Sequence, residues 1–252
     1  MNREATGLAG ARHKHYETLG STNAEALALA RAGERGPLWI TAATQTAGRG
    51  RRGRAWVSKP GNLYATLLLT EPSPPALAAQ LSFVAALALH DAVAHCAPQL
   101  GPALKVKWPN DLLLGLKKLA GILIEGENAP ALTVVIGIGV NCAHHPDDTA
   151  FPATDLAVAD ALVSPEQMVV ALVEAMDRRL TQWARGEGFA TIRADWLKRA
   201  AGLGEVVRVR LPEREFSGLF RGLDDNGRLL VQQAGVVTPV TAGEVFGFGG
   251  IS

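Results

Sequence analysis

The chain has 252 residues, of which 48% are hydrophobic and 19% are charged. This composition supplies enough apolar material for a sizeable core and excludes a globally disordered protein. Lys and Arg number 25 and Asp and Glu number 24, which excludes the strongly basic background of a dedicated nucleic-acid coat. With a prior of roughly 150 residues per domain, we expect one large domain and one small one.

The cysteine content and the N-terminal residues predict a cytoplasmic protein. Cys96 and Cys142 are too few for a disulfide framework and lack metal-ligand spacing. Residues 1–17 are polar, without the apolar core of a signal peptide. Apolar runs such as Leu63–Thr70 fall far below the roughly 20 residues that span a bilayer, so we expect no membrane partner.

Helices and strands are predicted in turn along the first 141 residues. A capping-box pattern at 22–25 begins a helix that ends near residue 33, and strands follow at 38–44 and 63–70. A helix from about 76 to 96 is apolar almost all round, which predicts burial. Turn signals then separate strands at 104–108, 112–114, 119–125 and 132–141. This order predicts an α+β fold with a meandering sheet.

A further helix and an all-strand region complete the chain. Ser164 and Pro165 suit a helix start, and apolar residues recur at helical spacing from Met168 to Trp183, which predicts a stripe facing the core. Short strands are predicted at 206–211, 216–223, 228–232 and 236–241, with a hairpin turn at Asp-Asp-Asn-Gly, 224–227. We therefore predict domains at 1–202 and 203–252, the second a small β-barrel.

The most unusual segment is 48–54, Gly-Arg-Gly-Arg-Arg-Gly-Arg. Glycines let a backbone approach a ligand closely, and guanidinium groups offer paired donors to phosphate or carboxylate oxygens. Charged residues between the glycines distinguish the segment from dinucleotide-binding and Walker-type fingerprints. A flexible solvated basic loop and a nucleic-acid contact that also uses Trp56 and Lys59 are the alternatives.

Residues 105–111, Lys-Val-Lys-Trp-Pro-Asn-Asp, form a second polar cluster. Strand alternation places Lys105 and Lys107 on one face, and the Pro-Asn turn presents Asp111. Inward-facing lysines would be costly unless they met anions. The alternative is an exposed edge strand, where lysine commonly blocks aggregation.

Glycines alternate at positions 137 and 139 in an apolar strand that ends at Asn141. They leave space for a ligand, a bulge or a closely packed helix. The adjacent His144 and His145 would point to opposite faces of a strand and lack a third ligand at metal spacing, so we interpret them as a solvated loop. Without a Gly-x-Ser-x-Gly elbow, the side chains favour anion binding and charge stabilisation in phosphoryl or nucleotidyl transfer.

Taken in order, STN at 21–23, GRGRRGRAW at 48–56, KWPNDL at 107–112, KLAGILIE at 118–125 and GIGVN at 137–141 resemble the biotin protein ligase family. The resemblance runs from about residue 21 to residue 247. It implies a class II synthetase-like, biotin–lipoate ligase catalytic domain with a mixed sheet and helices, followed by an SH3-like β-barrel.

The resemblance implies that ATP activates biotin to biotinyl-5′-AMP, from which biotin passes to a lysine of the biotin carboxyl carrier protein of acetyl-CoA carboxylase. Only about 20 residues precede Ser21, too few for a three-helix DNA-binding unit, so we expect the monofunctional type without DNA binding. Family members are monomers or homodimers that pair through sheet edges, and the sequence does not decide between them. A lipoate protein ligase, which shares the fold and the adenylation logic, is the enzymatic alternative.

The resemblance also implies roles for individual residues. Lys118, Arg51 and Asp111 are the expected catalytic residues, with Lys118 on the biotin carboxylate or acyl phosphate and Asp111 in acyl transfer. The expected biotin-binding residues are Ser21, Thr22, Asn23, Gln45, Gly48, Arg49, Arg51, Lys118, Gly121 and Gly139. The expected ATP-binding residues are Arg49, Arg51, Arg52, Arg54, Trp56, Lys107, Asn110, Lys118 and Asn141. Mg²⁺ is expected to accompany ATP near Asn141.

Overall fold

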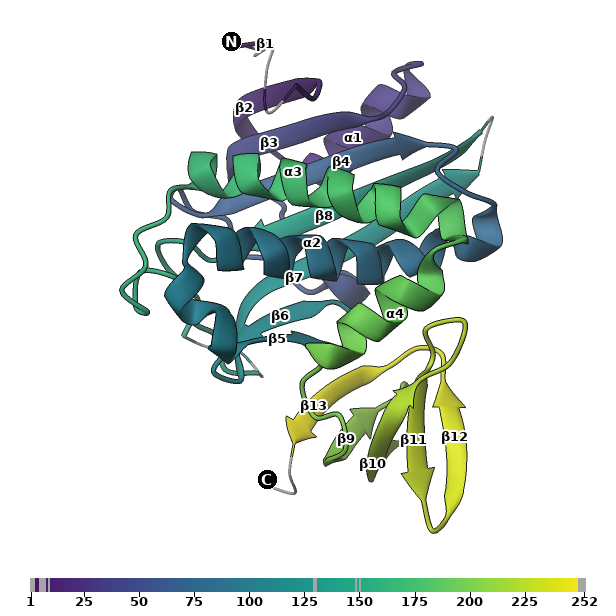
Figure 1. The fold of residues 1–252 in the computed structure, drawn as a ribbon. Helices are drawn as coiled ribbons and strands as arrows, with labels where there is room; N and C mark the ends of the chain where they lie inside the picture. Colours follow the sequence, from purple (N-terminus) through teal and green to yellow (C-terminus); the bar gives the residue numbers. More distant parts are fainter. Residues whose placement is uncertain are drawn as a thin grey trace.

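The computed structural model describes residues 8, 10–128, 131–147, 149 and 151–248, together with the backbone of residues 3 and 4. The larger part of the molecule is a mixed sheet with helices packed against it. The smaller part is the five-stranded antiparallel sheet drawn in yellow and yellow-green in Figure 1.

Eight strands form the large sheet in the order β1-β2-β3-β4-β8-β7-β6-β5. Only β2 and β3 run parallel, whereas the other neighbouring strands are antiparallel. The predicted meander is confirmed, because β5 to β8 pair in sequence order. The bounds are β1 Arg3–Glu4, β2 His13–Leu19, β3 Leu38–Gln45, β4 Leu63–Thr70, β5 Leu104–Lys107, β6 Asp111–Leu114, β7 Lys117–Asn128 and β8 Leu132–Val140.

The helices cover both faces of this sheet. On one face, α2 and α3 pack side by side over the sheet, with α4 alongside α2 (Figure 1). On the other, Leu27 of α1 clusters with Ile40 and Leu68, whereas Trp39 and Leu67 belong to the core beneath α2. Neighbouring residues of a strand point to opposite faces, so one run of apolar strand residues serves both cores. The helix bounds are α1 Thr22–Arg31, α2 Leu81–Cys96, α3 Pro165–Trp183 and α4 Phe189–Lys198.

Burial explains the apolar character of the segment that contains α2. Among the described residues, Pro75–Cys96 is the one helical stretch long and apolar enough to cross a membrane, with a mean hydropathy of 1.6. Most of the helix is nevertheless buried against the sheet, α3 and α4, as the sequence predicted. The stripe on α3 is confirmed as core, and a capping box at Ser164 and Gln167 begins that helix.

The smaller sheet has the strand order β12-β11-β10-β9-β13 and confirms an all-β C-terminal part. Its hairpin turn, Asp224 to Gly227, contacts the large part, because Trp108 Nε1 donates to Gly227 O at 3.2 Å. The predicted boundary at 202/203 lies between α4 and β9. The bounds are β9 Val206–Arg210, β10 Glu215–Leu223, β11 Leu229–Gln233, β12 Val236–Val240 and β13 Glu244–Phe248.

Sequence analysis predicted neither β2 nor α4. The segment of β2 is polar, and its side chains are half-buried or exposed, so no apolar alternation announces it. Pairing with β3 holds it in place instead. In α4, Phe189, Ile192 and Trp196 are buried at helical spacing, a signal that was present in the sequence.

Candidate active site

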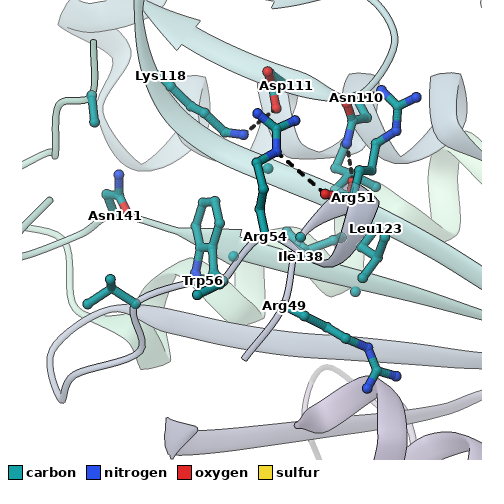
Figure 2. A pocket seen from close by; sticks show the side chains of 18 of the residues that line it. Arg49, Arg51, Arg54, Trp56, Asn110, Asp111, Lys118, Leu123, Ile138 and Asn141 are labelled. Atoms are coloured by element: carbon teal, nitrogen blue, oxygen red, sulfur yellow. Dashed lines mark hydrogen bonds and ion pairs between the residues drawn. The ribbon is translucent and has the colours of Figure 1, made fainter. Parts of the chain in front are cut away.

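One cavity of about 430 Å³ opens between the large sheet, the Gly/Arg loop (residues 48–56) and the start of β13. Of the site residues expected from the sequence, all except Gly48 and Arg52 line it. Figure 2 shows Lys118 reaching toward Asp111 near the Trp56 indole, while Arg49 points away from that cluster. The expected residues in the lining are Ser21, Thr22, Asn23, Gln45, Arg49, Arg51, Arg54, Trp56, Lys107, Asn110, Asp111, Lys118, Gly121, Gly139 and Asn141.

The Gly/Arg loop folds back on itself at the cavity mouth. Gly50 N donates to Arg54 O at 2.7 Å, and Trp56 N donates to Gly48 O at 2.9 Å. Between these bonds, Arg51–Gly53 forms a single 3-10 turn in which Arg52 has a φ of 57° and is exposed. The turn therefore separates two consecutive arginines: Arg51 lies in the cavity lining and Arg52 lies outside it.

Each arginine that lines the cavity already has a partner within the protein. Arg49 forms an ion pair with Glu125 at 3.2 Å, and Arg54 forms one with Glu244 at 3.0 Å. Arg51 donates to Gly243 O at 3.2 Å and to Asn110 at 3.4 Å, and burial lowers the pKa of its guanidinium. Arg49 and Arg54 are thus held at the cavity by exposed ion pairs, which are weak and can be exchanged for a ligand.

Asp111 lies in the cavity lining between two lysines. Its carboxylate contacts Lys107 Nζ at 2.8 Å and Lys118 Nζ at 2.6 Å. Burial alone would raise the pKa of Asp111, but the two ammonium groups hold it down at about 2. Lys107 is only 2% exposed and also lies 3.9 Å from the centre of the Phe151 ring. Lys107 faces inward and meets an anion, so the interpretation as an aggregation-blocking edge is wrong for this residue.

The Trp56 indole lies against the glycines of β7 and β8. A Cβ placed on Gly139 would be 2.6 Å from Trp56 Cε2, and one placed on Gly121 would be 3.1 Å from Trp56 Cζ3. Lys118 Nζ is 5.4 Å from the centre of the same ring. In this structure an aromatic side chain therefore uses the space that the glycines leave beside the sheet.

A hydrogen-bonded cluster of uncharged side chains forms another part of the cavity lining. Thr22 N donates to Gln45 Oε1 at 2.8 Å, and Gln45 Nε2 donates to Ser58 Oγ at 2.9 Å. Asn23 Nδ2 donates to Glu125 at 2.8 Å, while Thr66 Oγ1 lies 2.7 Å from Asn23 Oδ1 and 2.8 Å from Thr22 Oγ1. The amides and hydroxyls here offer directional hydrogen bonds rather than charge.

Asn141 does not by itself form a metal site. Its Nδ2 donates to Thr154 O at 3.0 Å, which leaves the amide oxygen as its one potential metal ligand. Mg²⁺ commonly needs one or two carboxylates together with substrate phosphates, but the carboxylates in the lining, Asp111 and Glu244, are paired with cations. Across the described residues, no group of three His, Cys, Asp or Glu side chains could hold a metal ion.

His144 and His145 lie in a loop, as predicted, but both side chains are half-buried and hydrogen-bonded rather than solvated. His145 Nδ1 lies 2.6 Å from the buried carboxylate of Asp155, and His144 Nε2 lies 3.0 Å from Pro60 O. Both rings therefore hold the loop after β8 to the rest of the molecule. Nothing in their spacing along the sequence points to these partners.

Four residues of the site escaped sequence analysis as site residues: Glu125, Glu244, Thr66 and Phe151. Glu125 ends the motif KLAGILIE, in which only Lys118 and Gly121 were expected to be site residues. Its position four residues after Gly121 in one strand indicated that both face the same side of the sheet. Glu244 and Thr66 carried no such signal, because they come from β13 and β4, far away in the sequence.

The fold and the site together define a biotin/lipoate-type ligase domain joined to a small β-rich domain. Residues 20–141 match the biotin/lipoate A/B protein ligase family, and residues 202–246 match the biotin protein ligase C terminal domain. A Paracoccus denitrificans protein named biotin–[acetyl-CoA-carboxylase] ligase is 45% identical over 91% of this chain and 98% of its own length. The chain belongs to the biotin protein ligase family.

Two solved structures have the same architecture. The biotin protein ligase from Aquifex aeolicus in complex with biotin and ATP superposes with a TM-score of 0.79 at 24% identity, covering 92% of this chain and 97% of its own. The biotin protein ligase from Leishmania major in complex with biotinyl-5′-AMP gives a TM-score of 0.65 at 26% identity, covering 91% and 98%. These likenesses confirm the predicted fold class.

Proposed function

We propose that this protein activates biotin with ATP to form biotinyl-5′-AMP and then transfers the biotinyl group to a lysine of the biotin carboxyl carrier protein of acetyl-CoA carboxylase. One observation carries the proposal: five cationic side chains and only two carboxylates line a single cavity. Those cations are Arg49, Arg51, Arg54, Lys107 and Lys118. Two anionic substrates repel each other, and such a cluster offsets the repulsion.

In the first step, an oxygen of the biotin carboxylate attacks the α-phosphorus of ATP, and the bond from that phosphorus to the oxygen of pyrophosphate breaks. Negative charge builds up on the α-phosphate oxygens as the new bond forms. Lys118 and Arg51 stand at the cavity with donors that can stabilise this charge, once Lys118 exchanges Asp111 for the ligand. Lys107 stays on Asp111 and keeps that carboxylate neutralised.

In the second step, the acceptor amine attacks the acyl carbon, and the bond from that carbon to the AMP phosphate oxygen breaks. Asp111, with its pKa held at about 2, remains an anion at neutral pH and is a poor store for a proton. It suits the task of orienting the incoming amine by accepting a hydrogen bond. Proton removal then falls to another group, such as a phosphate oxygen or water.

Two parts of the cavity lining suit the two ends of the adenylate. The uncharged cluster of Ser21, Thr22, Asn23 and Gln45 fits the ureido head of biotin, and Gly121 and Gly139 fit its chain once Trp56 moves from them. Trp56 and Asn141 then fit the nucleotide. Mg²⁺ would reach this site on the ATP phosphates, since the residues present do not build a cage for it. A cytoplasmic location and separate domains at 1–202 and 203–252 belong to the same proposal.

The decisive experiment incubates the protein with Mg-ATP, an apo carrier domain, and either labelled biotin or labelled lipoate. We expect label to reach the carrier lysine from biotin alone. A carrier whose acceptor lysine is replaced by arginine serves as the control and should remain unlabelled. Transfer from lipoate would support a lipoate ligase instead, and salt-dependent nucleic-acid binding without any transfer would favour the nucleic-acid alternative.

A further inference from the structure

We infer that Thr66, Asn23 and Glu125 form a directed hydrogen-bond relay that makes the Thr22 hydroxyl an acceptor, so that the head-group site selects ligands carrying an N–H donor. The inference rests on the proposed function, because it takes the group that binds at Thr22 to be the ureido ring of biotin. Thr66 and Glu125 act as positioning residues that reach the ligand only through Thr22.

The direction of the relay follows from groups that can only accept. Asn23 Nδ2 lies 2.8 Å from the Glu125 carboxylate and 3.3 Å from Leu123 O. Both partners are acceptors, so the NH₂ end of the Asn23 amide must face them. The Asn23 carbonyl oxygen therefore faces Thr66.

The hydroxyl protons are then assigned by counting. Asn23 Oδ1 cannot donate, so the 2.7 Å contact with it uses the single hydroxyl proton of Thr66. The 2.8 Å contact between Thr66 and Thr22 must in turn use the hydroxyl proton of Thr22. Two hydroxyl protons serve three oxygen–oxygen contacts, and this assignment leaves only the longest of them, 3.1 Å between Thr22 Oγ1 and Gln45 Oε1, without a proton.

Gln45 completes this assignment from the other side. Ser58 Oγ donates to Trp56 O at 2.9 Å, so Ser58 accepts from Gln45 Nε2. The Gln45 carbonyl oxygen thus faces Thr22, where the backbone N–H of Thr22 satisfies it at 2.8 Å. The longer contact of 3.1 Å between Gln45 Oε1 and the Thr22 hydroxyl needs no proton of its own.

Thr22 is left with uncommitted lone pairs at the cavity wall and no proton to offer. Thr66 is fully buried and Thr22 is 4% exposed, so water has little access to these hydroxyls and does not readily reverse the direction of their hydrogen bonds. A ligand that brings an N–H donor satisfies Thr22, whereas one without it leaves a desolvated acceptor unpaired. Sites built to bond an N–H or O–H group can reject analogues without it by about 10⁴-fold or more. A dithiolane head carries no such donor.

Gly137 provides an independent mark of the relay. A Cβ at this position would collide with the Asn23 carboxamide, whose Cγ would lie 2.9 Å away. Gly137 also pairs with Leu123, whose carbonyl oxygen is one of the acceptors for Asn23. Because position 137 carries no side chain, the Asn23 side chain can cross β8 and reach Glu125.

The test compares binding of biotin with binding of a carbocyclic analogue that has CH₂ in place of both ureido N–H groups, measured by calorimetry. The wild-type protein should prefer biotin by more than about 100-fold. Thr66→Val removes the hydroxyl that fixes the direction of the relay and leaves the Thr22 hydroxyl free to turn. The ratio of the affinities for biotin and the analogue should therefore fall about tenfold or more. Gly137→Ala, which displaces Asn23 from the other side, should narrow it likewise.

Two controls separate the relay from a loss of folding. Thr66→Ser keeps the hydroxyl and should restore the preference, and Thr41→Val removes a buried hydroxyl elsewhere in the sheet and should leave the preference unchanged. An undiminished preference in folded Thr66→Val would overturn the relay while the proposed function stands. Failure of the wild-type protein to bind biotin would instead contradict the proposed function.

Discussion

The proposed role of Lys118 requires that its ammonium group exchange Asp111 for the ligand. Lys118 forms an ion pair with Asp111 at 2.6 Å, yet its side chain remains 28% exposed, so it can reach a ligand in the cavity. Lys117, its neighbour in β7, is exposed and lies outside the cavity lining. Strand alternation thus separates a candidate catalytic lysine from a matched control.

We predict that Lys118→Ala abolishes biotin-dependent ATP–pyrophosphate exchange, with a loss of about 10²-fold or more, because it removes a donor from the developing charge. The exchange of labelled pyrophosphate into ATP measures this step alone. Lys117→Ala should exchange at the wild-type rate. Normal exchange by a folded Lys118→Ala variant would exclude the proposed role.

Asp111 contributes to stability as well as to the site. Its substitution by Asn would leave the buried ammonium of Lys107, 2% exposed, without a counter-charge. We predict a loss of about 3–5 kcal/mol in the free energy of unfolding at pH 7, measured by urea denaturation. The exposed Asp160→Asn should change it by less than about 0.5 kcal/mol.

The same carboxylate sets a pH dependence whose sign can be worked out. Because its pKa falls from the ordinary aspartate value of 3.8 to about 2, Asp111 stabilises the folded state fully above pH 4. That contribution disappears as the pH falls from about 4 to about 2. The wild-type protein should therefore lose more stability across this window than Asp111→Asn does, and equal losses would count against the ion pairs.

At the scale of elements, the Gly/Arg loop connects the large sheet with the small one. Arg51 bonds Gly243 O before β13 and Asn110 in the β5–β6 turn, and Arg54 pairs with Glu244. Closing such a loop over an adenylate would exclude water from a mixed anhydride that hydrolyses readily. These three contacts hold the loop to residues outside it.

We predict that Arg51→Ala accelerates release of biotinyl-5′-AMP about tenfold or more, measured by stopped-flow chase of the preformed complex, because one donor to the ligand and the hydrogen bonds of Arg51 to Gly243 and Asn110 are lost. Arg52→Asn is the control, since Asn tolerates the φ of 57° and Arg52 lies outside the cavity lining. Faster release in the control variant would restore the ATP-binding role expected for Arg52.

In the whole molecule, the small sheet contacts the segment 107–112 of the large part directly. The hairpin turn at Gly227 accepts a hydrogen bond from Trp108, the tryptophan between Lys107 and Asp111. Gly227 has a φ of 78°, and a Cβ there would lie 2.5 Å from Phe83 in α2. Backbone strain and lack of space both require glycine at this contact.

We therefore predict that Gly227→Ala destabilises the protein by more than Gly235→Ala, by about 1–3 kcal/mol in thermal or chemical unfolding. Gly235 has a similar φ of 85°, but a methyl group added there would meet no atom within 4 Å. Gly235→Ala therefore measures the cost of backbone strain without a steric clash. Equal losses for the two variants would show that the contact with Phe83 does not matter. Reduced adenylate formation in Gly227→Ala alone would link the small sheet to the positioning of Asp111.

The fold class, the meander, the buried helix α2 and most of the charged side chains of the cavity lining could be predicted from the sequence. Apolar periodicity and the ordered motifs are local properties, so they can be read along the chain. β2 was missed because a polar strand acquires its conformation from pairing with β3, which local periodicity does not record.

Only the tertiary structure decided which charges face one another. Asp111 is held between Lys107 and Lys118, Arg54 meets Glu244 from the far end of the chain, and Arg52 turns away from the cavity beside Arg51. The 25 basic and 24 acidic residues nearly cancel overall, yet the cavity collects more cations than anions. Such partnerships depend on distance and burial, because electrostatic interactions strengthen as water is excluded, and neither quantity is written in the order of residues.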